Sequence, residues 1–259
     1  MGNRRNLCAH FGALFYFVCP KGRKIMNNEI LLIGSVILTY GAVLAAYRLF
    51  GKTGLFAFTA LATVLANVEV LMIVEGFGME QTLGNVMFAS TYLVTDILSE
   101  NEGKASAARA VWVGVFTSVA MLLFTQYWML YDLAPSDWAG EAIRTIFSTT
   151  PRMLLASFLG YVISQRTDVW LYHFWWNLTE KKTGSHTAGL WLRNNGSTLI
   201  SQLINTVIFT TAAFAGWYDN STLFAVMLSS YVIYIVTSLL DTPVVYIARR
   251  MKRQGKIPD

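Results

Sequence analysis

The sequence has few charged residues, and this scarcity decides its class before any motif is considered. Asp, Glu, Lys and Arg make up 14% of the 259 residues, against about 25% in soluble domains. Hydrophobic residues make up 54%, and the mean hydropathy is +0.45. We therefore predict an all-α, polytopic helical membrane protein, with no room for a separate soluble domain.

Cysteine and catalytic motifs are also scarce. The two cysteines, Cys8 and Cys19, lie in the N-terminal extension, so the body of the chain cannot form a disulfide and redox chemistry is not expected. The three histidines do not form His-Glu-x-x-His, and there is no Gly-x-Ser-x-Gly, no phosphate-binding P-loop and no Cys/His cluster for a metal. We expect neither an enzyme nor a bound metal or cofactor.

Long apolar runs predict seven membrane spans, because a helix crosses the bilayer in about 20 residues. The fifth span begins near Pro151 and continues as a more polar, aromatic helix, and a loop is expected over 132–149. Residues 26–259 then form a single integral membrane domain. The other predicted spans are Asn28–Leu49, Gly54–Val74, Leu83–Leu98, Ala107–Tyr131, Arg193–Trp217 and Leu223–Ile247.

The lysines and arginines predict the orientation of these spans. The connections after the first, third and fifth spans carry two, two and four of them, and the C-terminal tail carries five. The three remaining connections carry only Arg144 and Arg152. Because basic loops stay in the cytoplasm, we expect a cytoplasmic C-terminus. The net charge of +5 then reflects topology and does not indicate nucleic-acid binding.

Residues 1–25 fit this orientation poorly. Arg4 and Arg5 precede an apolar run, as in a signal peptide, but the run is shorter than a span and the basic segment after it is a poor cleavage region. Translation from Met1 would place five basic residues outside, three of them close to the first span. We therefore expect translation to begin at Met26; a translocated, disordered extension is the alternative.

Amide side chains on one face of the sixth span are the first candidates for a site. Asn195, Thr198, Gln202 and Asn205 recur at i, i+3, i+7 and i+10, and Ser197 lies on the edge of this face. An amide facing lipid lacks partners at a cost of several kcal/mol, so the face meets a helix, a water-filled cavity or a ligand. Uncharged amides suit a neutral or weakly charged heterocycle better than an inorganic ion. Packing between helices is the alternative.

Acidic residues inside spans form the second set. Asp96, Glu69 and Asp241 each cost about 2.5–3.5 kcal/mol on insertion scales and should face protein or water. For Asp96 the alternative is an ion pair or cap near the cytoplasmic end of its span. For Asp241 it is a kink at Pro243, and Glu100 in SENEGK is interpreted as part of a helix end.

The fifth span carries a second polar face and several aromatic residues. Ser157, Tyr161, Ser164 and Asp168 recur at i, i+4, i+7 and i+11, with Gln165 adjacent. The tryptophans that follow are typical of an aromatic belt at the membrane interface. Stacking on a planar ligand is the sharper alternative for them.

Four segments resemble the signature blocks of the queuosine precursor transporter family, also called the VUT family. They occur in the family's order and lie within roughly residues 60–253; they are TYLVTDILSE, ASFLGYVISQRTDVW, NNGSTLISQLIN and LLDTPVVYIARR. The resemblance implies a bacterial inner-membrane importer with a six-helix core, to which the first span is an addition. It also implies similarity in fold to the substrate-binding components of energy-coupling-factor vitamin transporters.

The resemblance implies 7-deazaguanine substrates: 7-cyano- or 7-aminomethyl-7-deazaguanine, or queuine, for tRNA queuosine modification. A carboxylate can accept from two neighbouring guanine N–H groups; Asp96 is the first candidate and Glu69 the second. Two positions depart from the family pattern, because an Asp is expected where this chain has Asn205 and a Lys where it has Tyr234. An importer driven by a separate energy-coupling ATPase module, carrying another heterocycle or vitamin, is the alternative, ahead of an intramembrane enzyme or scaffold.

These observations define a set of expected substrate-binding residues, in which Asn195, Gln202 and Asn205 line one cavity with Asp96. The full set is Asp96, Glu69, Asn67, Asn195, Ser197, Gln202, Asn205, Gln165, Trp176 and Asp241.

Overall fold

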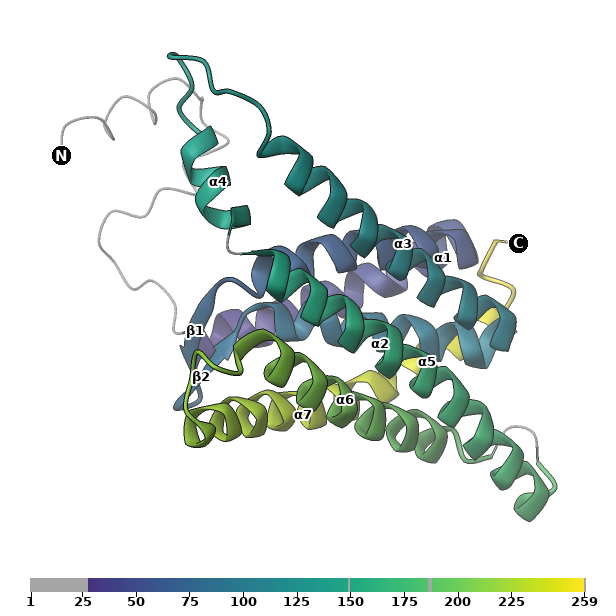
Figure 1. Cartoon of the computed structure of the whole chain (residues 1–259). Coiled ribbons are helices and arrows are strands. Elements are labelled where there is room, and N and C mark those ends of the chain that lie inside the picture. The colour runs from purple at the N-terminus through teal and green to yellow at the C-terminus, as the bar shows by residue number, and fades with distance from the viewer. Residues whose placement is uncertain (1–27, 149, 186–187, 259) are drawn as a thin grey trace.

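The computed structural model describes residues 28–148, 150–185 and 188–258, so the extension of residues 1–25 lies outside the described residues. The described chain is a helical bundle with one small hairpin (Figure 1). The elements are α1 (Asn28–Glu69), β1 (Ile73–Gly76), β2 (Met79–Thr82), α2 (Gly84–Asn101), α3 (Lys104–Trp128), α4 (Gly140–Ser148), α5 (Thr150–Thr183), α6 (Leu190–Phe214) and α7 (Asn220–Arg253).

Helix α1 consists of two spans that meet at Gly51. Gly51 has φ +59° and ψ −145°, a conformation that glycine adopts readily. A straight helix of 42 residues would separate its ends by about 60 Å. Yet the Asn28 side-chain amide donates to the carbonyl of Glu75, six residues beyond the end of α1, at 2.7 Å. The chain therefore reverses at Gly51, and the two halves of α1 correspond to the first two predicted spans.

The second span is shorter than predicted. The helix ends at Glu69, and Val74, the expected end of the span, lies in strand β1. β1 pairs antiparallel with β2, and Phe77 and Gly78 both have positive φ in the two-residue turn. The apolar run misled the prediction because hydropathy alone cannot separate a short apolar strand from the end of a helix.

Part of the segment expected to be a loop is also helical. Residues 132–149 contain α4, a nine-residue helix, and the Asp137 carboxylate accepts from the backbone N–H of Gly140 at its start. Ile143 and Ile146 on this helix are 39% and 42% exposed. In Figure 1, α4 lies beyond the ends of α3 and α5, away from the rest of the bundle.

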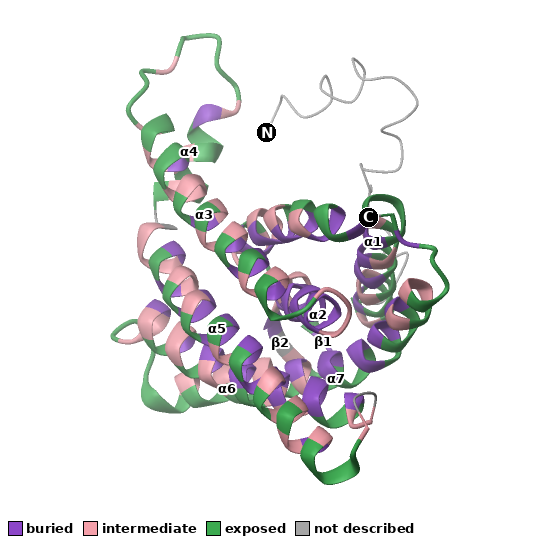
Figure 2. Cartoon of the chain, turned by 90° about the vertical axis from the view of Figure 1, so that its right-hand side faces the viewer, coloured by how far each residue is buried: buried purple, intermediate pink, exposed green. Residues whose placement is uncertain are grey.

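Within the described residues, four helices are long and apolar enough to cross a membrane: α1, α3, α6 and α7, with a fifth if α4 and α5 form one bent span. The reversal within α1 adds another crossing. Helix α2 runs through the middle of the bundle, between α1, α3, α5 and α7 (Figure 2), and 14 of its 18 residues are buried. The prediction of an all-α, multi-pass membrane protein is confirmed.

The four connections that carry most of the basic residues gather at one end of the bundle. The turn at Gly51 lies against the carbonyl of Pro258 in the C-terminal tail. Lys252 on α7 pairs with Glu102, which follows α2, at 2.8 Å. The hairpin and the turn between α6 and α7 lie at the opposite end (Figure 1). The alternation of basic and non-basic connections in the sequence therefore corresponds to two physical ends.

Candidate functional site

The polar face of α6 is turned into the bundle. Asn195, Thr198, Gln202 and Asn205, which share this face by helical periodicity, are at most 5% exposed. Helix α6 packs mainly against α5 and α7. The inference that these amides avoid lipid is confirmed, and the partners that they meet decide what the face does.

Three buried aspartates from three different helices converge near this face. Asp96 on α2, Asp168 on α5 and Asp241 on α7 are each 0% exposed, and their carboxyl groups interact electrostatically with one another. The Thr198 hydroxyl donates to Asp96 Oδ2 at 3.0 Å, and the Ser201 hydroxyl donates to Asp168 Oδ1 at 2.9 Å. Two hydroxyls from one turn of α6 thus donate to an aspartate of α2 and an aspartate of α5.

The third aspartate is joined to α6 through its neighbours on α7. The Asn195 amide donates to the Thr242 hydroxyl at 2.7 Å, and the Ser238 hydroxyl donates to the Asn195 side-chain oxygen at 3.3 Å. α7 remains a continuous helix across Pro243. Asp241 is therefore held at the centre by the residues on either side of it.

Several polar atoms of this centre have no hydrogen-bond partner among the described residues. They are Asp96 Oδ1 and both amide atoms of Gln202, whereas the Asp241 carboxyl group has the Tyr40 hydroxyl of α1 as a neutral partner. A buried polar group without a partner costs about 1–3 kcal/mol, and native proteins leave few of them. We call Asp96, Asp168, Asp241 and Gln202 the acidic centre, and it is the strongest candidate site in the described chain.

Two other predicted residues near the acidic centre already have partners. The Gln165 amide donates to the Thr91 hydroxyl at 2.6 Å, and its oxygen lies 3.3 Å from the Thr95 hydroxyl, so it joins α5 to α2. The Ser197 hydroxyl donates to the Arg193 carbonyl of its own helix at 2.7 Å. Both residues border the acidic centre, and each is engaged within the protein.

Asn205 lies elsewhere, in a cavity of about 30 Å³ towards the hairpin end. Asn85 and Tyr234 also line this cavity, and the Tyr234 hydroxyl donates to the Asn85 side-chain oxygen at 3.2 Å. Asp96, Asn195 and Gln202 do not line it. The expectation that Asn205 shares a cavity with Asp96 is therefore wrong. The two positions that depart from the family pattern, Asn205 and Tyr234, do line the same cavity.

Asn67 and Glu69 also lie away from the acidic centre. The Asn67 amide donates to the Thr63 carbonyl one turn earlier at 2.8 Å. Glu69 ends α1 at the level where this helix packs against Gly84, at the start of α2. Asp96 lies twelve positions after Gly84 on α2, a distance of about 18 Å along a helix. The structure thus separates the first and second carboxylate candidates.

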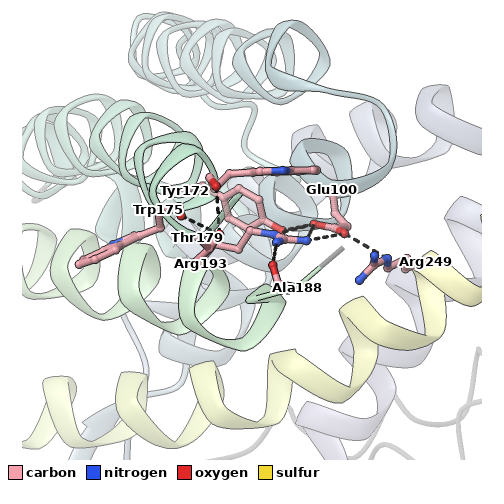
Figure 3. Close-up of polar contacts among 8 residues, drawn as sticks. Glu100, Tyr172, Trp175, Thr179, Ala188, Arg193 and Arg249 are labelled. Atoms are coloured by element: carbon pink, nitrogen blue, oxygen red, sulfur yellow. Dashed lines mark hydrogen bonds and ion pairs between the residues drawn. The ribbon is translucent and has the colours of Figure 1, made fainter. Parts of the chain in front are cut away.

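A second buried cluster lies at the basic end of the bundle, where Glu100 joins four helices (Figure 3). The Arg193 guanidinium donates to both Glu100 oxygens at 2.7–2.9 Å and to the Ala188 carbonyl at 2.7 Å. Arg249 Nε lies 3.2 Å from Glu100 Oε1, and the Tyr172 hydroxyl donates to Oε2 at 2.9 Å. The side chains of Arg193 and Glu100 are 0% and 2% exposed. Glu100 lies in the last turn of α2, which ends at Asn101, so its interpretation as part of a helix end is confirmed. The structure adds that Glu100 is the hub of an ion-pair network.

Trp176 belongs to this second cluster and not to the acidic centre. The Arg193 guanidinium carbon lies 4.2 Å from the centroid of its ring, within the range of a cation–π contact. His173 stacks on Trp176 with an interplanar angle of 2°. The planar partners of Trp176 in this structure are therefore protein groups.

Asp168 and Arg193 are the residues that sequence reasoning did not include in the site. The polar periodicity of the fifth span contained Asp168, but the segment QRTDVW resembles a span leaving the membrane. Arg193 was counted as a basic residue of a connection. Its partner Glu100 is 93 positions away, and no local pattern relates the two.

The comparisons with known proteins place these clusters within a family. Residues 82–248 match the family model described as "Putative vitamin uptake transporter". The chain belongs to this family. It is also 39% identical over 226 residues to the "Probable queuosine precursor transporter" of Bacillus subtilis (strain 168), a match that covers 87% of this chain and 96% of the relative. No solved structure matches. The family match contains Asp96, Asp168, Asp241 and the Glu100–Arg193 pair, and α1 lies before it.

Proposed function

We propose that this protein imports queuosine precursors across the bacterial inner membrane for the modification of tRNA. The acidic centre carries the proposal, because it places unpartnered carboxylate and amide atoms in the middle of a membrane-spanning bundle. The similarity to the probable queuosine precursor transporter of Bacillus subtilis, which covers 87% of this chain, supports a queuosine precursor as the substrate. The candidate substrates are 7-cyano- and 7-aminomethyl-7-deazaguanine and the free base queuine.

The chemistry of the acidic centre matches a guanine-type ring. The Asp96 carboxylate, whose Oδ1 is unpartnered, can accept from neighbouring guanine N–H groups, and the Gln202 amide can both donate and accept along the same edge. The basic connections at one end of the bundle support a cytoplasmic C-terminus. The cavity of Asn205, which lies towards the hairpin end, is then on the outer side.

Rescue of tRNA queuosine in a bacterial strain unable to make or import the precursor tests this function. We expect queuosine in tRNA when the chain is expressed and the medium supplies a precursor, and none with an empty vector. No rescue despite normal amounts of the protein in the membrane would contradict the proposal. Repeating the assay in a host without energy-coupling ATPases distinguishes a self-sufficient importer from the binding component of an ATPase-driven one.

A further inference from the structure

The acidic centre contains charge of one sign. Asp96, Asp168 and Asp241 are fully buried, and the hydroxyls that donate to them, such as those of Thr198 and Ser201, are neutral. Three carboxylates within electrostatic range of one another cannot all remain ionised in a low-dielectric interior without a counter-charge. Something positive must therefore enter this centre when its carboxylates are ionised.

The protein itself provides no such charge in the described residues. Arg193 is the basic residue of α6, and its guanidinium donates to Glu100 and to the Ala188 carbonyl. Arg249 pairs with Glu100, and Lys252 pairs with Glu102. No Lys or Arg in the described chain forms an ion pair with any of the three aspartates.

A second observation indicates that a ligand supplies the missing partners. Gln202 is 0% exposed, and both of its amide atoms lack a partner among the described residues. It lies one turn after Thr198, which donates to Asp96, and next to Ser201, which donates to Asp168. Thr198 holds Asp96 of α2 against α6 one turn before Gln202. The Gln202 amide and the free oxygen of Asp96 can therefore bind one edge of a ring together.

We propose that the three aspartates make the site selective for a cationic substrate, so that it prefers the aminomethyl deazaguanine over the cyano compound. This inference rests on the proposed function and specifies the substrate class of the same site. An alkyl ammonium group offers a positive charge and three N–H donors to the carboxylates, whereas a nitrile offers neither. The aminomethyl compound carries one charge and stays within the expectation based on the amides alone, which is a neutral or weakly charged heterocycle.

Direct binding to the full chain in lipid nanodiscs at pH 7 tests the proposal. Three ligands separate charge from shape: 7-aminomethyl-7-deazaguanine, its 7-cyano analogue and the 7-ethyl analogue, which has nearly the size of the aminomethyl compound without its charge. We expect the aminomethyl compound to bind at least about tenfold more tightly than either neutral ligand. Equal affinities for the three ligands would overturn the proposal and leave the proposed import function standing.

Asp168→Asn is the decisive variant, because Asp96 is also assigned to the guanine edge. We expect it to weaken binding of the aminomethyl compound about tenfold or more and binding of the cyano compound less than about threefold. Retained binding of the cyano compound shows that the variant is folded, and Asp219→Asn, outside the bundle centre, is the matched control. An equal loss for both ligands would overturn a role in charge selection.

If Asp168→Asn does not fold, the ligand series on the unaltered chain decides alone. If none of the three ligands binds and tRNA rescue also fails, the proposed function falls together with this inference.

Discussion

The two buried charge clusters of this protein differ in composition. Around Glu100, one carboxylate meets two guanidinium groups and a tyrosine hydroxyl, and Arg193 is enclosed by an aromatic ring and a backbone carbonyl. In the acidic centre, three carboxylates meet only neutral donors. A buried charge without a partner costs several kcal/mol in a membrane protein. The charges of the first cluster are therefore balanced within the protein, whereas the second cluster needs a ligand or protons to balance its charge.

The paired cluster also has a position that matters for transport. It ties α2, α5, α6 and α7 together at the end that carries the basic connections. A substrate leaving the acidic centre towards this end must pass where these helices meet.

Arg193→Ala should have the largest effect. It leaves Glu100 buried with only Arg249 as a cationic partner, and breaking such a pair costs about 3–5 kcal/mol. We expect a strong fall in folded protein and in the thermal unfolding midpoint in detergent, measured by size-exclusion chromatography and calorimetry. The double variant Glu100→Gln with Arg193→Met removes both charges and should recover part of the stability. A fully stable Arg193→Ala protein would show that the pair is dispensable.

Asp96→Asn should abolish uptake while leaving the protein in the membrane. The change replaces a carboxylate that has no ion-pair partner in the described chain, so the stability lost is small compared with that of Arg193→Ala. Precursor uptake and membrane abundance are measured in the same cells. Uptake at the wild-type rate with normal abundance would remove Asp96 from the site.

Asn205→Asp should be tolerated, with uptake within about threefold of the unaltered protein. Asn205 lies outside the acidic centre, in the small cavity that Asn85 and Tyr234 also line. The Asn85 amide nitrogen has no partner among the described residues and is available to donate to the new carboxylate. The same uptake assay applies, and a complete loss would argue against the family pattern expected at this position.

Asp219→Asn should have the smallest effect and is the control for the other aspartates. Asp219 is exposed at the start of α7, where the hydroxyls and backbone N–H groups of Ser221 and Thr222 donate to it and hold its pKa below the usual value. Asn is an equally good N-cap residue, so uptake at pH 7 should not change.

A depressed pKa means that the stabilisation by Asp219 is complete above the ordinary carboxylate pKa of about 3.9 and is lost only as the pH falls below it. Unfolding midpoints measured at pH 7 and pH 3 test this.

The sequence predicted those parts of the molecule that depend on local periodicity. Hydropathy identified the spans, and a spacing of three and four residues placed Asn195, Thr198 and Gln202 on a buried face. It failed where the outcome depends on which helices pack together. Asp168 joins Asp96 only because α5 and α2 both pack near the same turn of α6, and Glu100 pairs with Arg193 across 93 positions. The prediction for the residues after Glu69 failed for a different reason. The apolar residues of strand β1 cannot be distinguished by hydropathy from the end of an apolar helix.

The position of α2 has a consequence for how the protein is made. This helix has 18 residues, carries Asp96, and is covered by α5 and α7, which the ribosome synthesises later. An isolated α2 in lipid would expose its aspartate and hydroxyls to hydrocarbon. We therefore expect α2 to stay beside the insertion machinery, or at the membrane surface, until α5 and α7 have been synthesised. A nascent chain that stops before α7 would keep this helix uncovered, and cellular quality control could recognise the unfinished protein by it.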